Sequence, residues 1–523
     1  MSGIDLSLKR ITKLLSSVCT YTRPTCHIAG TNGKGSVSAL LSSVLSAASY
    51  CVGRFNSPHL VSIYDCITID SEPVSPSVYA DVRRRVEAAN AALELHSTNF
   101  ELLACTALTV LEESRVDVAV VEVGMGGRLD ATNALPDACV LVSALTAVDL
   151  DHTSFLGDTV ALIAREKAGI ARKGRPFVLG PQKYEDVERV ARRVVEECGA
   201  TFVKAIVPTS RAWDERIDGP YTPVTRFAPE DLQELPPQPV EAAVAPFPGF
   251  LRLLLPLQGE HQLANLGIAL SMISSLLVHC SSSPLRFSDK LTMHAIQSGI
   301  RQTHWPGRLS LHCVPIPRAL GAGIPQQEPP SGSCERKVLV LADGAHNPSS
   351  SATLSSYLTA LFAASSRNMC AHPFSPPAPF ATSTLPPPPR PRTVNLTFML
   401  GLSRSPPKTP TQTLTPLLTL RPQCHTNVIL RTRAALLRFT TPDGMPWIKS
   451  ESPSELKRVV DSLLPEVAEV WAAEDDEPAE GQIADALNWA VQRADADARK
   501  GVTDDEHLII LAGSLFVQHS TST

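Results

Sequence analysis

The chain has 523 residues, too many for one ordinary hydrophobic core, so two or three domains are expected. Hydrophobic residues make up 43% and charged residues 19%, which is typical of a globular protein and excludes a fibrous or fully disordered one. The net charge of −5 argues against a nucleic-acid partner, because such partners require a basic surface.

The twelve cysteines are scattered singly, without a CxxC pair, which favours reduced thiols over a disulfide framework or a zinc site. The first residues carry Asp5 and lack the apolar segment of a secretory signal. No apolar run reaches the ~18 residues of a membrane helix. We therefore expect a cytoplasmic protein without a membrane partner, with a mitochondrial pool as an open alternative.

The most informative segment is residues 26–36, CHIAGTNGKGS, which predicts a buried strand, a glycine-rich turn and an apolar helix over 37–48. Its glycines let backbone N–H groups approach a phosphate, the helix N-terminus adds positive potential, and Lys34 supplies a charge. Two residues separate Gly30 from the Gly-Lys pair, against four in the common P-loop. The segment predicts a variant site for the ATP phosphates, made of Gly30, Thr31, Asn32, Gly33, Lys34, Gly35 and Ser36.

Apolar runs and helix-like segments alternate after this turn. Strands are predicted at 116–124, 138–147, 178–181 and 200–207, and helices at 77–95, 101–114, 159–171 and 184–197. This alternation predicts a mostly parallel, doubly wound α/β sheet. The proline-rich stretch 208–248 predicts an elaborated loop or a peripheral β segment, before a strand at 251–257 and an apolar helix within 259–278.

A composition break at 305–307 predicts a domain boundary, with an ATP-binding domain in residues 1–300 and a second α/β domain in residues 301–523. The alternation restarts there, with strands at 337–342, 393–400, 428–430, 467–472 and 506–511 and helices at 349–364, 454–463 and 483–494. The proline-rich run 372–392 cannot bury enough apolar surface to form a core, so we expect a dispensable insertion. A role as an SH3-type ligand is the alternative. Residues 315–335 are expected to form a further loop.

Polar clusters follow several of these elements, at residues 55–60, 122–133, 149–152 and 165–170. Because ligands bind at the carboxyl ends of strands in an open α/β sheet, Glu122 and His152 should lie beside the phosphate loop. A carboxylate, an imidazole and a hydroxyl near a polyphosphate suit a divalent metal, normally Mg²⁺. Histidine is an uncommon Mg²⁺ ligand, so a structural or acid–base role for His152 stays open, as does a surface position for Lys167.

The ordered segments GTNGKGS, SPHL, EVGMGGRLDATN, DHTSFLG, EKAGI, GEHQLAN, WPGR and DGAHNP resemble the folylpolyglutamate synthase and dihydrofolate synthase family of Mur-ligase-like enzymes. The resemblance runs from Ile4 to Leu515. It implies an α/β Mur-ligase-like fold, with an N-terminal P-loop ATPase domain around a mostly parallel, doubly wound sheet. A smaller, Rossmann-like α/β domain would follow. The family joins an amino acid to a carboxylate with ATP.

The resemblance also implies roles for single residues of the first domain. Ser57, Glu122 and His152 resemble the family's Mg²⁺ ligands, beside Lys34 at the ATP phosphates. Lys167 matches a lysine that is carbamylated in such enzymes, which would turn a cation into an anion able to hold a second metal. Lys34, His152 and Lys167 are thus the expected catalytic residues.

Further expected contacts lie on both sides of the predicted domain boundary. Asn265 resembles the residue on the adenine side of the nucleotide. Arg308, Asp343 and His346 resemble residues that close over the nucleotide and the incoming amino acid. Asp130, in the Arg-Leu-Asp segment, is the candidate contact to the pterin or pteroate.

The segment after SPHL separates two branches of the family. The branch that extends folates usually carries an Arg-Glu-Arg-like run there, whereas residues 61–70 are VSIYDCITID. This form, the opening IDLSLKRITKLL and the segment GMPWI at 444–448 resemble the dihydrofolate synthases of fungi. We expect a monomer that joins L-glutamate to 7,8-dihydropteroate through an acyl phosphate; extension of tetrahydrofolates is the alternative.

Two other classes of protein also carry phosphate loops. A nucleotide-gated regulatory protein would be expected to lack Glu122, His152 or Lys167, and all three are present. A P-loop kinase or GTPase is disfavoured by the spacing of the loop and by the lack of a base-specificity motif. Phosphate release measured with and without glutamate separates both from a ligase.

Overall fold

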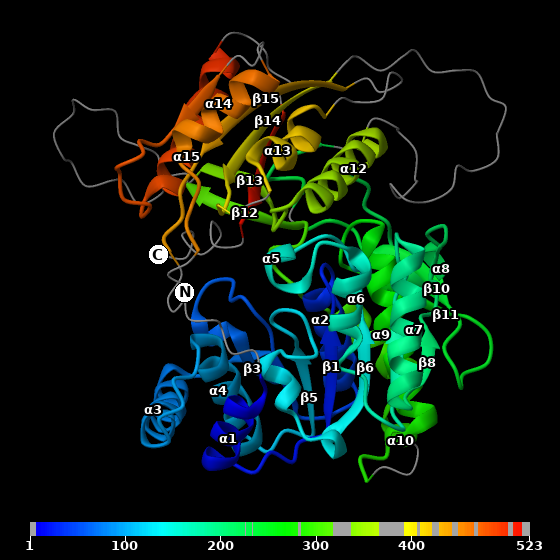
Figure 1. The fold of residues 1–523 in the computed structure, drawn as a ribbon. Helices are drawn as coiled ribbons and strands as arrows, with labels where there is room; N and C mark the ends of the chain where they lie inside the picture. Colours follow the sequence, from blue (N-terminus) through cyan, green and yellow to red (C-terminus); the bar gives the residue numbers. More distant parts are fainter. Residues whose placement is uncertain are drawn as a thin grey trace. The chain divides into compact units, whose positions relative to one another are not determined.

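The computed structural model describes residues 7–514, apart from 225, 233, 281–283, 317–335, 366–391, 405–407, 421–427, 442–447, 465–468 and 500–505 (Figure 1). The chain divides into two compact units, Met1–Arg211 with Pro237–Trp305, and Ala212–Pro236 with Pro306–Thr523. The predicted insertion at 372–392, the loop at 315–335 and the GMPWI segment fall almost entirely outside the described residues.

Residues 212–236, which the sequence placed in the first domain, belong to the second unit. Phe227 is buried in the core of that unit, where its ring lies 5.6 Å from the ring of Phe362. Its backbone N–H also donates to the carboxylate of Glu506 at 2.6 Å. The chain therefore leaves the first unit, packs on the second and returns, which composition alone does not reveal.

The first unit is built on an eight-stranded sheet with the order β4-β3-β2-β5-β1-β6-β7-β8. The strands from β2 to β8 in this order are parallel, and β3 and β4 add an antiparallel edge. Their bounds are β1 (Thr25–Ala29), β2 (Val52–Phe55), β3 (Ile67–Ile69), β4 (Glu72–Pro73), β5 (Val118–Glu122), β6 (Val140–Leu145), β7 (Pro176–Leu179) and β8 (Thr201–Lys204). The central strands β1, β5 and β6 are buried at every residue, as a sheet covered on both faces requires.

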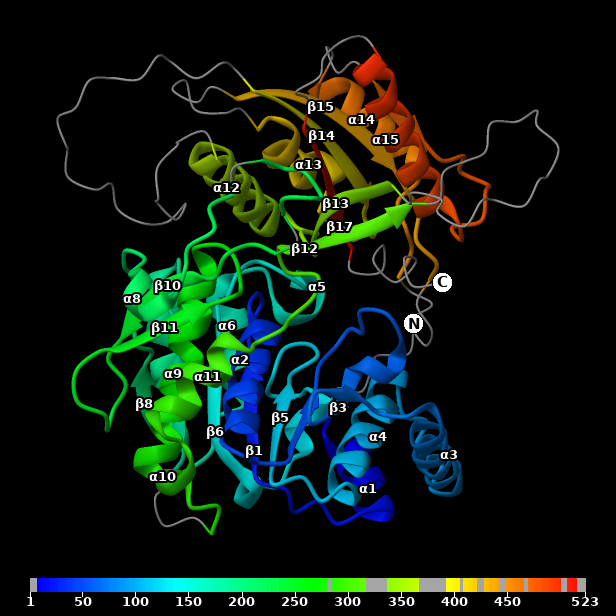
Figure 2. The same ribbon diagram turned by 180° about the vertical axis from the view of Figure 1, so that it is seen from behind.

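Helices cover both faces of this sheet (Figure 2). Val118 and Val120 of β5 join one core cluster, and Ala119 and Val121 join another, because successive side chains of a strand point to opposite faces. The first cluster includes α2 (Lys34–Ala47), α9 (His261–His279) and α11 (Met293–Arg301). The opposite face is covered by α1 (Lys9–Val18), α3 (Pro76–Ala92), α4 (Asn99–Glu113), α6 (Val160–Ala168) and α7 (Glu185–Cys198).

Helix α9 is long and apolar enough to cross a membrane by length and composition alone. In the described chain, 72% of its most apolar window is buried inside the first unit. Leu266, Leu270 and Ile273 are among its residues in the core against the sheet. Packing in a protein core therefore accounts for the hydropathy of α9.

Short elements complete the first unit. A three-stranded antiparallel sheet, in the order β11-β10-β9, contains β9 (Thr209–Ser210), β10 (Gln238–Ala242) and β11 (Leu251–Leu255). It confirms the expected peripheral β segment after residue 208. The short helices are η1 (Ile63–Cys66), η2 (Ala131–Ala134), η3 (Asp137–Cys139), α5 (Thr153–Leu156) and α10 (Phe287–Lys290), with α8 (Glu215–Asp218) in the second unit.

The second unit has a six-stranded sheet in the order β12-β13-β17-β14-β15-β16, parallel except for the edge strand β12. The strands are β12 (Ser310–Ile316), β13 (Arg336–Asp343), β14 (Arg392–Gly401), β15 (Val428–Leu436), β16 (Val470–Ala472) and β17 (Glu506–Gly513). Helices α12 (Pro348–Ser365), α13 (Pro410–Leu418) and α14 (Pro453–Leu463) pack on one face, and α15 (Gln482–Arg499) packs on the other. This is the second α/β domain that the alternation predicted.

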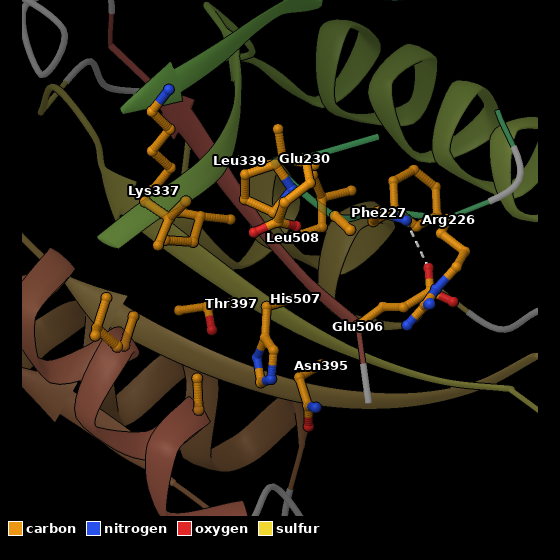
Figure 3. A pocket seen from close by; sticks show the side chains of 17 residues that line it. Arg226, Phe227, Glu230, Lys337, Leu339, Asn395, Thr397, Glu506, His507 and Leu508 are labelled. Atoms are coloured by element: carbon orange, nitrogen blue, oxygen red, sulfur yellow. Dashed lines mark hydrogen bonds between the residues drawn. The ribbon is translucent and has the colours of Figure 1, made fainter. Parts of the chain in front are cut away.

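A cavity of about 470 Å³ lies at the amino ends of β13, β14 and β17 (Figure 3). The ladder between β13 and β17 begins only at Val340 and Ile509, so the residues before them line the cavity. Thr397 and His507 lie on one side, and Phe227 closes another. In open α/β sheets ligands bind at the carboxyl ends of the strands, so this cavity lies at the opposite end from the expected site.

Candidate active site

The phosphate loop connects β1 to α2 at the carboxyl end of the first sheet, as predicted. The backbone N–H groups of Thr31 and Asn32 donate to the carbonyl of Ala147 at 2.8 and 3.2 Å. The hydroxyl of Thr146 donates back to the carbonyl of Asn32 at 2.7 Å. Gly33, which precedes α2, has a φ of 91°, a backbone conformation that residues with a Cβ rarely adopt. The loop is thus held by hydrogen bonds to Thr146 and Ala147, directly after β6.

Lys34 curls over this loop. Its Nζ donates to the carbonyl oxygens of Gly30 and Thr31 at 3.2 and 3.4 Å and lies 3.7 Å from the Glu122 carboxylate. Glu122 is the buried last residue of β5, and it accepts a hydrogen bond of 2.6 Å from Asn56 Nδ2. The structure therefore brings Glu122 to the phosphate loop, as the strand order requires.

Lys167 reaches the same loop from α6. Its side chain is only 3% exposed, and its Nζ donates to the Gly30 carbonyl at 2.9 Å. Burial, helped by the nearby charge of Lys34, lowers the pKa of Lys167 to about 7, against the opposing effect of Asp151 and Asp130. The surface position that the sequence left open for Lys167 is therefore wrong.

We predict that this burial makes stability depend on pH. The folded-state pKa of Lys167 lies below the ordinary value of 10.5, so between about pH 7 and 10 the unfolded chain binds more protons. In buffer free of carbon dioxide, wild-type stability should therefore rise with pH over this range relative to Lys167→Met, on the order of 3 kcal/mol. Denaturant melts of both proteins at pH 7 and pH 10 check this, and parallel curves would contradict it.

The segment 124–133 is held against α6. The backbone N–H of Arg128 donates to the Glu166 carbonyl at 2.8 Å, and the two side chains form an ion pair at 2.9 Å. A Cβ on Gly127 would lie 2.8 Å from the carbonyl oxygens of both Glu166 and Lys167. Glycine at this position therefore allows the loop to lie directly on the turn that carries Lys167.

Asp130 is buried in this loop as an acceptor. Its Oδ2 accepts from the Met125 N–H at 2.8 Å, and its Oδ1 accepts from the N–H and the hydroxyl of Thr132 at 3.0 and 2.5 Å. Burial raises the pKa of Asp130, and these hydrogen bonds oppose the shift. The carboxylate thus has a fixed orientation, which a contact to a substrate requires.

The three expected metal ligands follow different elements of the first unit, and Glu122 is the one that lies at the phosphate loop, 3.7 Å from Lys34 Nζ. His152 is an exposed residue with a φ of 51° that precedes α5, and its N–H donates to Asp151 at 2.8 Å. Ser57 is half-buried after β2. Among the residues that the structure describes, no group of three or more His, Cys, Asp or Glu side chains is placed to hold a metal ion. The set Ser57, Glu122 and His152 stays a prediction.

Asn265 lies beside the phosphate loop, on α9. Its Nδ2 donates to Gln262 Oε1 at 2.8 Å, and Gln262 Nε2 donates to the Ser36 hydroxyl at 3.3 Å. Sequence reasoning missed Gln262 and Asn56 as parts of the site. Both residues lie inside segments that the sequence analysis had selected, GEHQLAN and residues 55–60. Their position in these segments was the signal that could have identified them.

In the second unit, residues 306–308 of the WPGR segment lie beside the DGAHNP segment at the end of β13, where the Gly344 N–H donates to the Gly307 carbonyl at 3.1 Å. The Leu309 N–H donates to the Asp343 carboxylate at 3.0 Å, and His346 Nδ1 lies 2.8 Å from the Gly344 carbonyl. Burial raises the pKa of Asp343 to about 6, against the opposing charge of Arg308. The structure thus brings Arg308, Asp343 and His346 into one loop cluster, and their closure over a nucleotide stays a prediction.

No protein-family model matches the chain. It is 32% identical to dihydrofolate synthetase of Saccharomyces cerevisiae over 459 residues, which are 87% of this chain and 86% of the yeast enzyme. The chain belongs to the dihydrofolate synthase and folylpolyglutamate synthase family. It is also 31% identical to a probable dihydrofolate synthetase of Schizosaccharomyces pombe over 358 residues, 68% of this chain and 72% of that protein. The predicted resemblance to fungal dihydrofolate synthases is confirmed.

Solved structures of this synthase family confirm the Mur-ligase-like fold. A structure of Mycobacterium tuberculosis folylpolyglutamate synthase with ADP and AMPPCP aligns with a TM-score of 0.67 and 24% identity, over 98% of this chain and 94% of that one. Escherichia coli FolC, in complex with DHPP and ADP, aligns with a TM-score of 0.63 and 22% identity, over 99% and 93%.

Proposed function

We propose that this chain uses ATP to join L-glutamate to 7,8-dihydropteroate, which yields dihydrofolate. The observation that carries the proposal is the buried cluster around Gly30, where Lys34, Glu122 and Lys167 meet in a glycine-rich loop. Cations and oriented N–H groups in such a loop stabilise the charge that develops on a transferred phosphoryl group. The similarity to two fungal dihydrofolate synthetases supports the choice of substrate.

The reaction needs a phosphoryl transfer because a carboxylate repels nucleophiles. An oxygen of the acceptor carboxylate would take the γ-phosphoryl group of ATP, and ADP would leave. Lys34 would neutralise part of the charge on the transferred group. The neutral amine of glutamate then attacks the carbonyl carbon of the acyl phosphate, phosphate leaves, and the nitrogen releases one proton to the departing phosphate or to solvent as the amide forms. Arg308, Asp343 and His346 are proposed to hold the nucleotide and the incoming amino acid, and Asn265 the adenine side.

The residues near the loop fit a magnesium ion. Glu122 offers a buried carboxylate whose orientation is fixed by Asn56, and Ser57 offers a hydroxyl, so two of the three proposed donors are the hard oxygens that Mg²⁺ prefers, whereas His152 would supply an imidazole nitrogen. We propose Glu122, Ser57 and His152 as its ligands. When bound, the ion would neutralise phosphate charge. A structure of a related bifunctional synthase with Mn, AMPPNP and L-glutamate bound is consistent with this requirement.

The loop after SPHL favours the first glutamate over extension. Asp65 accepts from the N–H groups of Leu60, Val61 and Ser62 at 3.0, 2.6 and 2.9 Å, and Asp70 accepts from Val52 at 2.8 Å. These carboxylates organise the loop, and residues 61–70 contain no cation. An extending enzyme must bind a substrate that already carries glutamate carboxylates, and residues 61–70 offer no cation to pair with them.

We predict the outcome of a product assay with ATP, Mg²⁺, L-glutamate and one of two acceptors. Dihydropteroate should be converted at least about tenfold faster than tetrahydrofolate, the scale of discrimination that a few pocket contacts provide. Products are separated by chromatography, and reactions without glutamate are the control. A chain that extends tetrahydrofolate well and ignores dihydropteroate would instead be a folylpolyglutamate synthase.

We further propose that the enzyme is a monomer in the cytoplasm, whose partners are its small-molecule substrates and neither nucleic acid nor membrane. The net charge of −5 and the scattered cysteines support this. The mitochondrial alternative predicts a pool that co-fractionates with that organelle. Light scattering of the purified chain and fractionation of cells test the two statements.

A further inference from the structure

A buried histidine lies behind the proposed contact to the acceptor substrate. His27 is in the middle of β1, with no exposed surface, among neighbours that are otherwise mostly apolar. Its Nε2 lies 2.9 Å from the hydroxyl oxygen of Thr132. That hydroxyl in turn donates to the Asp130 carboxylate at 2.5 Å. Three side chains from two distant parts of the chain thus form one line of hydrogen bonds.

The direction of these bonds fixes the protonation of His27. The single proton of the Thr132 hydroxyl goes to Asp130, so the hydroxyl oxygen accepts, and His27 Nε2 must carry the donated proton. Burial, together with the nearby Arg172, lowers the pKa of His27 to about 3. The imidazole is therefore neutral at physiological pH, protonated on Nε2 and bare on Nδ1.

This arrangement costs stability in the strand. Among the described residues, His27 Nδ1 has no hydrogen-bond partner although it is buried. A buried acceptor without a partner is unfavourable, and an apolar side chain in β1 would avoid it. A polar group at this position is therefore better explained by what its other nitrogen does at Thr132.

The loop beyond Thr132 is also fixed. Arg172, itself buried, donates to Asn133 Oδ1 at 2.8 Å and forms an ion pair with Asp137 at 2.7 Å. Arg172 thus holds the residues that follow Asp130 in the chain, Asn133 and Asp137. The bond from His27 instead acts on the Thr132 hydroxyl, which orients the Asp130 carboxylate. The two contacts have different targets, so their effects can be separated.

We infer that His27 is a positioning residue for the acceptor substrate: its Nε2–H orients the Thr132 hydroxyl, which orients the Asp130 carboxylate toward the heterocycle of that substrate. The inference rests on the proposed function, in which Asp130 contacts the pteroate. Two bonds on Oδ1 and one on Oδ2 leave one of the about four acceptor positions of this carboxylate, on Oδ2, for a single N–H donor of a flat heterocycle. Loss of the bond from His27 releases the hydroxyl and loosens that orientation.

The test compares Michaelis constants for three substrates. His27→Phe and Thr132→Val should each raise KM for dihydropteroate about tenfold, the effect expected from one misplaced hydrogen-bonding group, with KM for ATP and glutamate changed less than about twofold. His27→Gln keeps an N–H donor and should recover most of the loss, and Thr132→Ser should do the same for Thr132→Val. The double variant His27→Phe/Thr132→Val should have a KM for dihydropteroate no higher than that of the more impaired single variant. Both changes break the same line of hydrogen bonds, so their effects should not add.

Two outcomes overturn the inference: KM values for all three substrates that rise together, or an unchanged KM for dihydropteroate in a folded variant. If His27→Phe does not fold, the Thr132→Val and Thr132→Ser pair gives the same comparison. A wild type without glutamate-dependent ADP formation would instead refute the proposed function. If the wild type prefers tetrahydrofolate, KM for that acceptor is measured in the same variants.

An independent measurement uses the wild type alone. Nitrogen-15 labelling of histidine should show one ring, absent from His27→Gln, with a protonated Nε2 and a bare Nδ1 that stay unchanged between pH 6 and 8. A signal for this ring with the proton on Nδ1, or one that titrates in this range, would overturn the direction of the hydrogen bonds.

Discussion

Replacement of Lys34 by alanine should lower glutamate-dependent ADP formation by about a hundredfold or more, because the variant lacks the cation placed to stabilise the transferred phosphoryl group. The fold should be kept, since Lys34 is partly exposed and contacts two loop carbonyls and Glu122 at 3.7 Å. Glu122 also keeps its hydrogen bond from Asn56. Coupled detection of ADP and thermal melting check the two parts of this expectation.

Lys204→Ala is the matched control. Lys204 is an exposed lysine of the same unit that pairs with Glu188 at 3.0 Å, and such surface pairs contribute about 0 to 1 kcal/mol. It should melt and turn over like the wild type. Wild-type turnover in Lys34→Ala would contradict the role of Lys34 at the phosphates. Loss of activity with a collapsed melting transition would show a structural role instead.

The second large effect is expected at Lys167. We predict that its amine reacts with carbon dioxide, so that an N–C bond forms, a proton leaves and a carbamate anion replaces the cation. The reaction requires the neutral amine, which the lowered pKa of about 7 makes available. A buried ammonium beside Lys34 would also repel a metal ion bound at Glu122. Lys167→Ala and Lys167→Arg should therefore both lose activity by about a hundredfold or more.

The alternative to carbamylation is an ordinary salt bridge of Lys167 to a carboxylate, and it predicts that Lys167→Arg is tolerated. The carbamate reading predicts instead that short carboxylic acids partly restore Lys167→Ala, because they replace the missing anion. Depletion of bicarbonate should lower wild-type activity reversibly. Intact-protein mass under nondenaturing conditions gives a readout besides activity. Normal turnover of Lys167→Ala would refute the role.

The sequence by itself determined the elements that depend on local pattern. The buried strand and glycine-rich turn of residues 26–36 appear as β1 and the phosphate loop, because both follow from apolar runs and glycine spacing. The expected helix over 159–171 is confirmed, but α6 ends at Ala168, before Gly169. The expected strands at 116–124 and 138–147 are confirmed as β5 and β6, with bounds that differ by a few residues.

Only the tertiary structure decided which of these residues meet. The short edge strands β3 and β4 carry too few residues for a periodic pattern, and residues 212–236 join the second unit through the packing of Phe227. The sequence gives no role for His27 within an apolar strand, because its hydrogen-bond partner Thr132 lies 105 residues later in the chain. The burial of Lys167 likewise follows from the approach of α6 to Gly30. The local hydrophobic pattern determines which face of each helix or strand is buried. The hydrogen bonds and lowered pKa values of the site arise between groups that are distant in sequence, and only the assembled sheet brings these groups together.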